Sequence, residues 1–204
     1  MTELNKINRA NSWYQEAETD YISAKSLFEC GQTARCVFFM QQSIELLIKG
    51  IFIECGITNQ PFKLKHHPEK KIKQLYQENG DTINSENCIY VLNAVGNKTF
   101  SEKLPVICQI CNSATDQYTR EWLISIEGGY YLHLKWNYVN NILFCLAVLF
   151  CDTEQNSRYP DNGSTKLRYD IDEVKRYIPS LLKFLKSIID TITYSISNDY
   201  VDIA

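Results

Sequence analysis

The chain carries a long apolar stretch near its N-terminus, CVFFMQQSIELLIKGIF at residues 36–52, that is interrupted by polar side chains at regular intervals. Gln41, Glu45 and Lys49 recur every four residues, a spacing that places side chains on one face of an α-helix. Glu45 precedes Lys49, which is the favourable order for an ion pair along a helix. The stretch therefore predicts a bundle helix with one line of polar groups, which need partners if they are buried. We call these three residues the polar track.

Hydrophobic periodicity predicts that this helix is the second half of a helical hairpin. Apolar residues at spacings of three and four predict a first helix over residues 11–29, closed near Gly31. The second helix is expected over residues 32–55, with Gly56 as its stop signal.

Three further helices are predicted from the same kind of pattern. A short basic helix is expected at residues 69–77 and a long, very apolar one at residues 130–151. The closing helix begins at Asp170, which we interpret as its N-cap. The polar segment before it contains Pro160 and an Asn-Gly pair, and such a loop is a natural position for a binding site.

Residues 81–129 are the least regular part of the sequence, and we expect one helix there, from about residue 103 to 122. We interpret this segment as a helical insertion. No strand-like alternation is long enough to build a sheet. The predicted fold is all-α, an up-and-down antiparallel helical bundle, with residues 1–204 as a single domain.

Charge and cysteine usage restrict the class of protein. The formal net charge of -3 excludes a uniformly basic nucleic-acid binder, so phosphate contacts must come from a local patch. One run of cations surrounds the start of the basic helix; it is either a solvated face or a surface that steers a polyanion. Its members are Lys63, Lys65, His66, His67, Lys70, Lys71 and Lys73.

The 8 cysteines lie mostly in apolar helical runs, and no signal peptide is evident, so we expect reduced thiols in a cytoplasmic protein. Cys108 and Cys111 have the spacing of metal ligands, but without a second pair they are interpreted as core residues, and no metal or cofactor is predicted. The apolar run at residues 138–151 is too short to span a membrane, so no membrane association is expected.

Four stretches, in this order, resemble a known family: WYQEAETDYISAKSLF at 13–28, CVFFMQQSIELLIKGIF at 36–52, KHHPEKKIKQLY at 65–76 and RYPD at 158–161, followed by the closing helix. Together they resemble the HEPN domain. The resemblance implies a four- or five-helix bundle, often dimeric, that binds nucleotide or RNA. It also implies an association with nucleotidyltransferase-type partner proteins or with toxin–antitoxin and defence systems.

Many members of that family are metal-independent ribonucleases that use an Arg followed, after four to six residues, by a His. This chain departs from that pattern, because no Arg stands at that spacing before His66, His67 or His133. The favoured interpretation is therefore a non-catalytic or partner-dependent nucleotide- or RNA-binding module. One alternative is a ribonuclease toxin in which His67 or His133 meets Arg158. Another is a helical adaptor or homodimer built on apolar faces at Tyr130, Tyr131, Leu134 and Trp136.

The candidate site combines the proline-stiffened turn with the polar track. Arg158 is suited to bidentate phosphate contact, although a salt bridge to Asp161 or Glu45 is the structural alternative. Tyr159 is expected to stack on a base, while Lys49 and His67 complete a polar cleft. Asp20, on the facing first helix, is expected to join Gln41, Glu45 and Lys49, either as a buried layer that fixes helix register or as the floor of that cleft.

Overall fold

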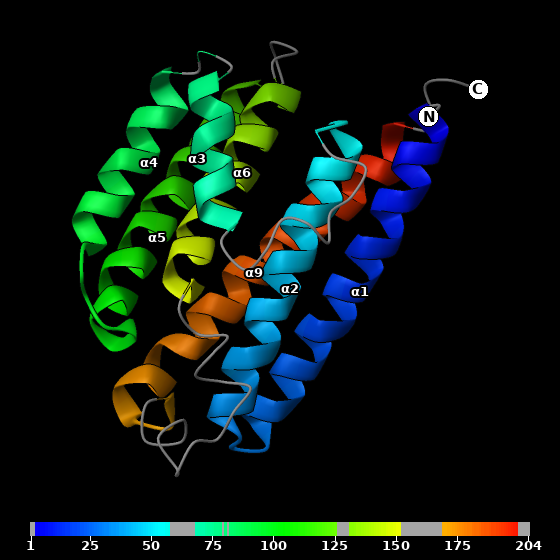
Figure 1. Ribbon diagram of the computed structural model, residues 1–204. Coiled ribbons are helices and arrows are strands. Elements are labelled where there is room, and N and C mark those ends of the chain that lie inside the picture. The colour runs from blue at the N-terminus through cyan, green and yellow to red at the C-terminus, as the bar shows by residue number, and fades with distance from the viewer. Residues whose placement is uncertain are drawn as a thin grey trace.

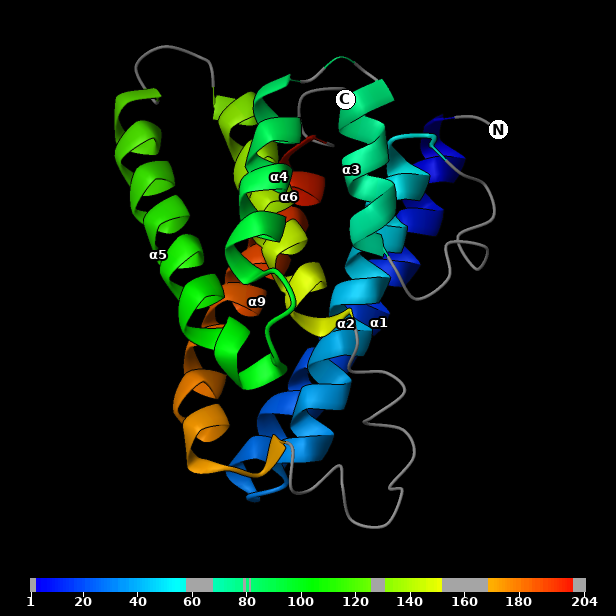
Figure 2. The ribbon, with the colours of Figure 1, turned by 60° about the vertical axis from the view of Figure 1, so that its left-hand side comes forward.

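The computed structural model describes residues 3–57, 68–78, 80, 82–125, 131–151 and 169–199. These residues form seven helices and no strand, which confirms the predicted all-α antiparallel bundle (Figures 1 and 2). The helices are α1 (Glu3–Glu29), α2 (Thr33–Glu54), α3 (Pro68–Glu78), α4 (Thr82–Val95), α5 (Phe100–Ser125), α6 (Tyr131–Phe150) and α9 (Asp172–Asp199).

Helices α1 and α2 form the predicted hairpin, and the glycine after each ends it as expected. Gly31 has φ 72° and Gly56 has φ 69°, a left-handed conformation that glycine adopts without steric cost. After α1, the Gln32 N–H donates to the Leu27 carbonyl, and after α2 the Ile57 N–H donates to the Phe52 carbonyl. These bonds satisfy carbonyls that would otherwise lack partners at the helix ends.

Small residues at intervals of seven let the two helices of the hairpin approach closely. Buried alanines recur along α1, and small buried residues recur at the same interval along α2. The register is fixed where the Ser43 hydroxyl donates to the Ala17 carbonyl at 2.7 Å. In an antiparallel pair this register sets each small residue of α1 opposite one of α2. The series are Ala10, Ala17 and Ala24 on α1, and Cys36, Ser43 and Gly50 on α2.

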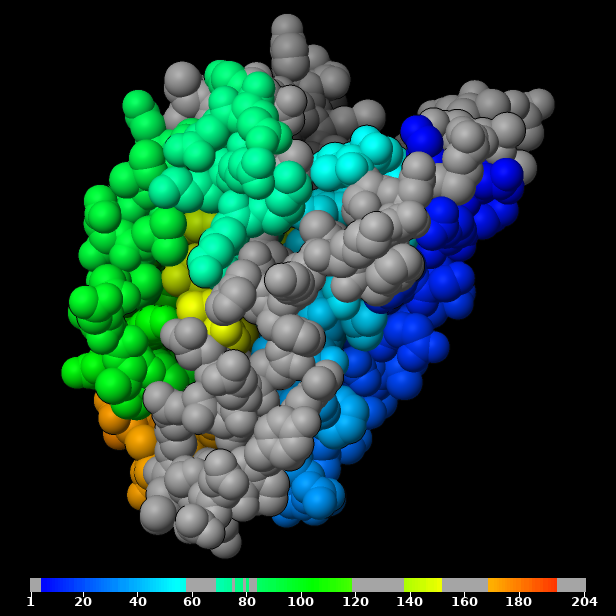
Figure 3. Space-filling view, viewed as in Figure 1, coloured from blue at the N-terminus to red at the C-terminus, as the bar shows by residue number. Residues whose placement is uncertain are grey.

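Helix α6 is the central helix, as its apolar sequence predicted. It contacts α2, α3, α4, α5 and α9, and every residue from Ile142 to Phe150 is buried. One cluster of buried apolar residues includes members of all seven described helices. In Figure 3, α1 and α2 form one side of the visible face and α4 and α5 the other, with part of α6 between them. That residues 1–204 are one domain with an insertion at 81–129 stays a prediction.

The segment expected to be least regular contains two helices instead of one. Helix α4 was missed because its apolar residues do not gather on one face, so it lacks a clear helical period. Helix α5 begins at Phe100 rather than at about residue 103 and extends to Ser125 rather than to about residue 122, with Pro105 inside it. Both helices pack on α6, so contacts with a central apolar helix stabilise segments whose own pattern is weak.

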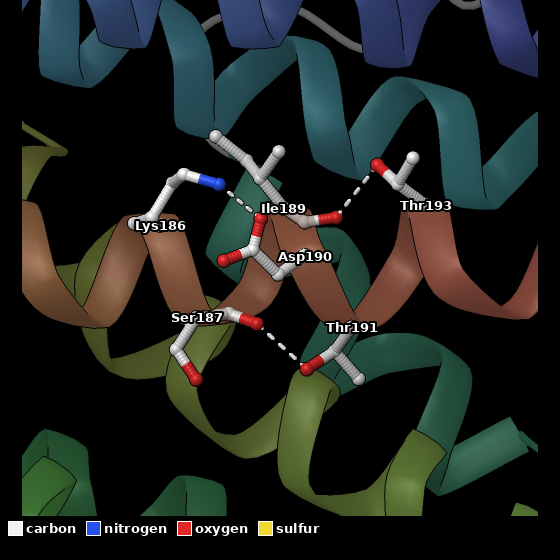
Figure 4. A network of polar contacts seen from close by, with 6 residues as sticks. All are labelled: Lys186, Ser187, Ile189, Asp190, Thr191 and Thr193. Atoms are coloured by element: carbon white, nitrogen blue, oxygen red, sulfur yellow. Dashed lines mark hydrogen bonds and ion pairs between the residues drawn. The ribbon is translucent and has the colours of Figure 1, made fainter.

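The closing helix begins at Asp172, two residues after the expected N-cap. The Asp170 carboxylate instead pairs with Lys175 at 2.8 Å, and the Lys175 N–H donates to the Ile171 carbonyl. Figure 4 shows Lys186 paired with Asp190 farther along α9.

Two hydroxyls on the same helix bond backward along it. The Thr191 and Thr193 hydroxyls donate to the Ser187 and Ile189 carbonyls at 2.6 and 2.8 Å (Figure 4). Each hydroxyl thus bonds to a carbonyl one turn earlier in its own helix.

Among the described residues, α2 is the one helix long and apolar enough to cross a membrane by length and composition. Of its most apolar window, 67% is buried inside the protein, as in the core helix of a bundle. The apolar run singled out in the sequence, at residues 138–151, overlaps a shorter apolar helical segment, Tyr138–Phe150.

Candidate functional site

The polar track lies on α2, and the structure pairs two of its three members. The Lys49 ammonium forms an ion pair with the Glu45 carboxylate, one helical turn earlier. The two side chains are only 15% and 12% exposed, so this pair is largely withdrawn from water. Gln41 is 6% exposed. The three polar groups are thus aligned on the hairpin. Because they are largely buried, loss of a hydrogen-bond or ion-pair partner would lower the free energy of unfolding.

Trp13 completes this group, although it was not among the site residues predicted from the sequence. The Lys49 Nζ atom lies 5.6 Å from the centroid of the Trp13 ring, within the range of a cation–π contact. This contact depends on the register of the hairpin, which places residue 11 of α1 level with Lys49. Lys49 is therefore held by an aromatic face from α1 and a carboxylate from α2.

A second close contact anchors the hairpin next to the track. The Tyr14 hydroxyl donates to the Glu54 carboxylate, and the Tyr14 ring lies over the bare backbone of Gly50. Burial raises the pKa of Tyr14 well above its ordinary value, and the nearby Glu54 raises it further. Tyr14 is therefore protonated at neutral pH and donates its hydroxyl hydrogen to Glu54.

Asp20 does not join Lys49. The same register places Asp20 opposite Met40, near Gln41 and about two turns from Lys49. Its side chain is half-buried, and its pKa is raised, first by burial and then by the neighbouring Glu16 carboxylate. Asp20 therefore stands at the Gln41 end of the hairpin, away from the ion pair.

The raised pKa of Asp20 predicts a stabilising substitution. Because the folded protein disfavours the ionised carboxylate, its contribution to stability is favourable below the unfolded pKa of roughly 3.9 and is lost as pH rises through the folded value. We expect Asp20→Asn to raise the free energy of unfolding at pH 7 by more than the roughly 0.2–0.5 kcal/mol of one like-charge pair on a helix, because it removes both the buried charge and its repulsion from Glu16. Urea unfolding at pH 7 and pH 3 checks this, and the gain should vanish at pH 3.

Glu16→Gln offers a matched comparison, because it removes the neighbouring charge and leaves Asp20 in place. It should also stabilise the protein at pH 7, by a smaller amount, since burial is the larger cause of the shift. A loss of stability in Asp20→Asn at pH 7 would show that the carboxylate has a favourable partner.

The remaining predicted site residues, Arg158, Tyr159 and His67, lie outside the described residues. Part of the cationic run is described. Lys70 is exposed on α3, Lys73 is half-buried, and Lys71 donates to Gln74 at 3.2 Å. Whether this run is only a solvated face or a surface that steers a polyanion stays a prediction, and its other members lie outside the described residues.

The two cysteines at metal spacing are core residues. Cys108 is 5% exposed and Cys111 0%, and burial raises the pKa of the Cys108 thiol to about 11. The Cys111 pKa is also raised, first by a side-chain hydrogen bond with Cys145 on α6. All 8 cysteines of the chain are free thiols.

The hairpin and its polar track lie within a region of the chain that matches a known protein family. Residues 10–102 match the family model of the HEPN domain. The HEPN match begins inside α1 and ends at the start of α5, so it covers somewhat less than half of the 204 residues. No curated protein and no solved structure matches the chain.

The HEPN match contains the hairpin and the whole polar track. It includes three of the four stretches that carried the resemblance, at residues 13–28, 36–52 and 65–76, and it leaves out the Arg-Tyr-Pro-Asp turn. It also includes residues 81–102, the first part of the segment that we interpreted from the sequence as a helical insertion.

Proposed function

We propose that this protein is a HEPN-type module that binds the phosphate-bearing part of a nucleotide or RNA. The observation that carries the proposal is the overlap between the HEPN match and the polar track, with Lys49 held between Glu45 and Trp13. An aromatic ring and a carboxylate hold the Lys49 ammonium in one position. Less side-chain freedom is then lost when an anion binds, which lowers the entropic cost of binding. The HEPN family is associated with nucleotides and RNA, so we propose that the bound anion is the phosphate of a nucleotide or of RNA.

In this proposal Arg158 contacts the phosphate and Tyr159 stacks on a base. Lys49 and His67 line the cleft, while Gln41, Glu45 and Asp20 form its floor or set the register of the hairpin. A planar guanidinium supplies two parallel donors to a phosphate, which a lysine does not. Because the family's usual Arg and His pair is missing from the sequence at its usual spacing, we propose binding without catalysis.

Arg158→Ala tests the site. We expect it to weaken binding of a fluorescently labelled oligoribonucleotide roughly tenfold or more, the loss of one charge-assisted contact, while the melting temperature stays nearly unchanged. Fluorescence anisotropy at two salt concentrations measures this, and binding should weaken steeply with salt. Arg35→Ala is the matched control, since Arg35 is an exposed arginine on α2.

Equal binding by Arg158→Ala and Arg35→Ala would remove Arg158 from the site. A large fall in melting temperature with binding intact would assign Arg158 to a structural salt bridge. Cleavage of the oligoribonucleotide in the presence of a chelator, lost on replacement of His67 or His133, would show that the module is a ribonuclease.

We further propose that the module works as a homodimer or with a nucleotidyltransferase-type partner, as in a toxin–antitoxin or defence system. The family's general association with such proteins supports this. Native mass spectrometry of the purified chain measures both the oligomeric state and any co-purified nucleotide. A bare monomer without nucleotide would count against a preformed dimer.

A further inference from the structure

A cavity of about 310 Å³ lies among α4, α5 and α6, away from the polar track. The three helices contact one another, and Figures 1 and 2 show them side by side on the part of the bundle far from α1. The volume is at the lower end of the range of small-molecule sites, so the cavity suits a compact ligand. We call it the amide cavity.

Carboxamide side chains from all three helices line the amide cavity. Asn87 comes from α4, Gln109 from α5 and Asn141 from α6. Asn87 and Gln109 are exposed, and Asn141 is half-buried. Each carboxamide offers one acceptor oxygen and two donor hydrogens. One carboxamide from each of three helices therefore lines the same space, where a ligand can replace the water bound to these groups.

Asn141 is the most informative of the three. It lies on the central apolar helix and is half-buried between Asn140 and the fully buried Ile142. A half-buried amide on the wall of an open cavity can keep its hydrogen bonds with water, and a ligand that enters the cavity must replace them. Asn141 is therefore placed to contact a ligand at the inner part of the cavity wall.

The floor of the amide cavity is apolar, and its edge carries an aromatic ring. Phe144 and Val91 are 2% and 4% exposed, and Cys88 and Cys145 lie beside them. Tyr90 is 64% exposed at the cavity. No charged side chain is among the described residues that line it. An anion or a cation would find no counter-charge here, so the lining selects for an uncharged ligand.

We propose that the amide cavity binds an uncharged planar heterocycle that carries both hydrogen-bond donors and acceptors, of the nucleobase or nucleoside class. Asn and Gln side chains make paired donor and acceptor contacts with such edges. A flat ring fits between an apolar floor and an aromatic edge. This site is separate from the polar track, and it does not depend on the proposed function of that track.

The test is isothermal titration with adenosine, guanosine, cytidine and uridine, supported by saturation-transfer NMR for weak binding. At least one nucleoside should bind the wild-type protein. Asn141→Leu and Asn87→Leu should each weaken that binding tenfold or more, because each removes one paired contact. Asn93→Leu is the matched control, since Asn93 is exposed on α4 outside the cavity, and it should bind as the wild type does.

Asn87 is exposed, so its variant stays informative if Asn141→Leu fails to fold. No binding by any of the four nucleosides at millimolar concentration would overturn the proposal. Unchanged binding in both variants would also overturn it. Titrations with a labelled oligoribonucleotide and with the corresponding nucleoside monophosphate distinguish a free small ligand from a base within an RNA chain. Equal binding of nucleoside and monophosphate supports a free small ligand, while binding of the oligoribonucleotide alone overturns it.

Discussion

Gly50→Val is expected to lower the free energy of unfolding by about 3 kcal/mol, at the upper end of the cost of overpacking a core. A Cβ atom built on Gly50 would lie 2.4 Å from Cε1 and 2.8 Å from Cδ1 of the Tyr14 ring. The ring has little freedom to move away, because it is buried and its hydroxyl is held by Glu54. Urea unfolding followed by circular dichroism measures the loss.

A double-mutant cycle separates this contact from a general intolerance of valine in α2. In the Tyr14→Ala background the added side chain has space, so Gly50→Val should cost at least about 1 kcal/mol less than in the wild type. Arg35→Val is the control for valine at an exposed position of the same helix, and it should change stability by no more than about 0.5 kcal/mol. Wild-type stability in Gly50→Val would show that the hairpin is more loosely packed than described.

Lys49→Met is expected to destabilise the fold by about 2–3 kcal/mol. It removes the cation and keeps most of the apolar stem, which leaves the Glu45 carboxylate without its lysine in a place that is 12% exposed. Breaking a fully buried pair costs roughly 3–5 kcal/mol, and the partial exposure of this pair reduces the cost. The double variant Glu45→Gln with Lys49→Met should recover most of the loss, because it removes the carboxylate charge together with the lysine.

The chain provides a matched exposed pair for comparison. Lys25 and Glu29 have the same four-residue spacing on α1, but they are 58% and 64% exposed and 4.0 Å apart. Lys25→Met should therefore change stability by no more than about 0.5 kcal/mol. Equal effects of Lys25→Met and Lys49→Met would mean that the track is open to water. If the double variant is stable but binds RNA more weakly, Lys49 acts in binding as well as in the fold.

Much of the hairpin could be predicted from local sequence. The ends of α1 and α2 followed from Gly31 and Gly56, because a left-handed residue that ends a helix is a local requirement. The pairing of Glu45 with Lys49 followed from their spacing, since one helical turn brings them together.

The contacts between helices could not be predicted in this way. That Lys49 meets Trp13, that Asp20 does not meet Lys49, and that Asn141 faces a cavity all depend on register and neighbours. Helix α4 was not predicted for the same reason, because it is stabilised by packing against α6 and its apolar residues have only a weak helical period.

The sequence by itself determined the all-α class, the helical hairpin and the line of polar groups along α2, because helical periodicity and capping depend only on residues close together in the chain. The tertiary structure alone decided how deeply that line is buried and which aromatic ring meets its cation. It also decided that three amides from three helices share one space. Those outcomes depend on how the small residues of α1 and α2, and the apolar faces around α6, pack together, and packing involves partners that are distant in the chain.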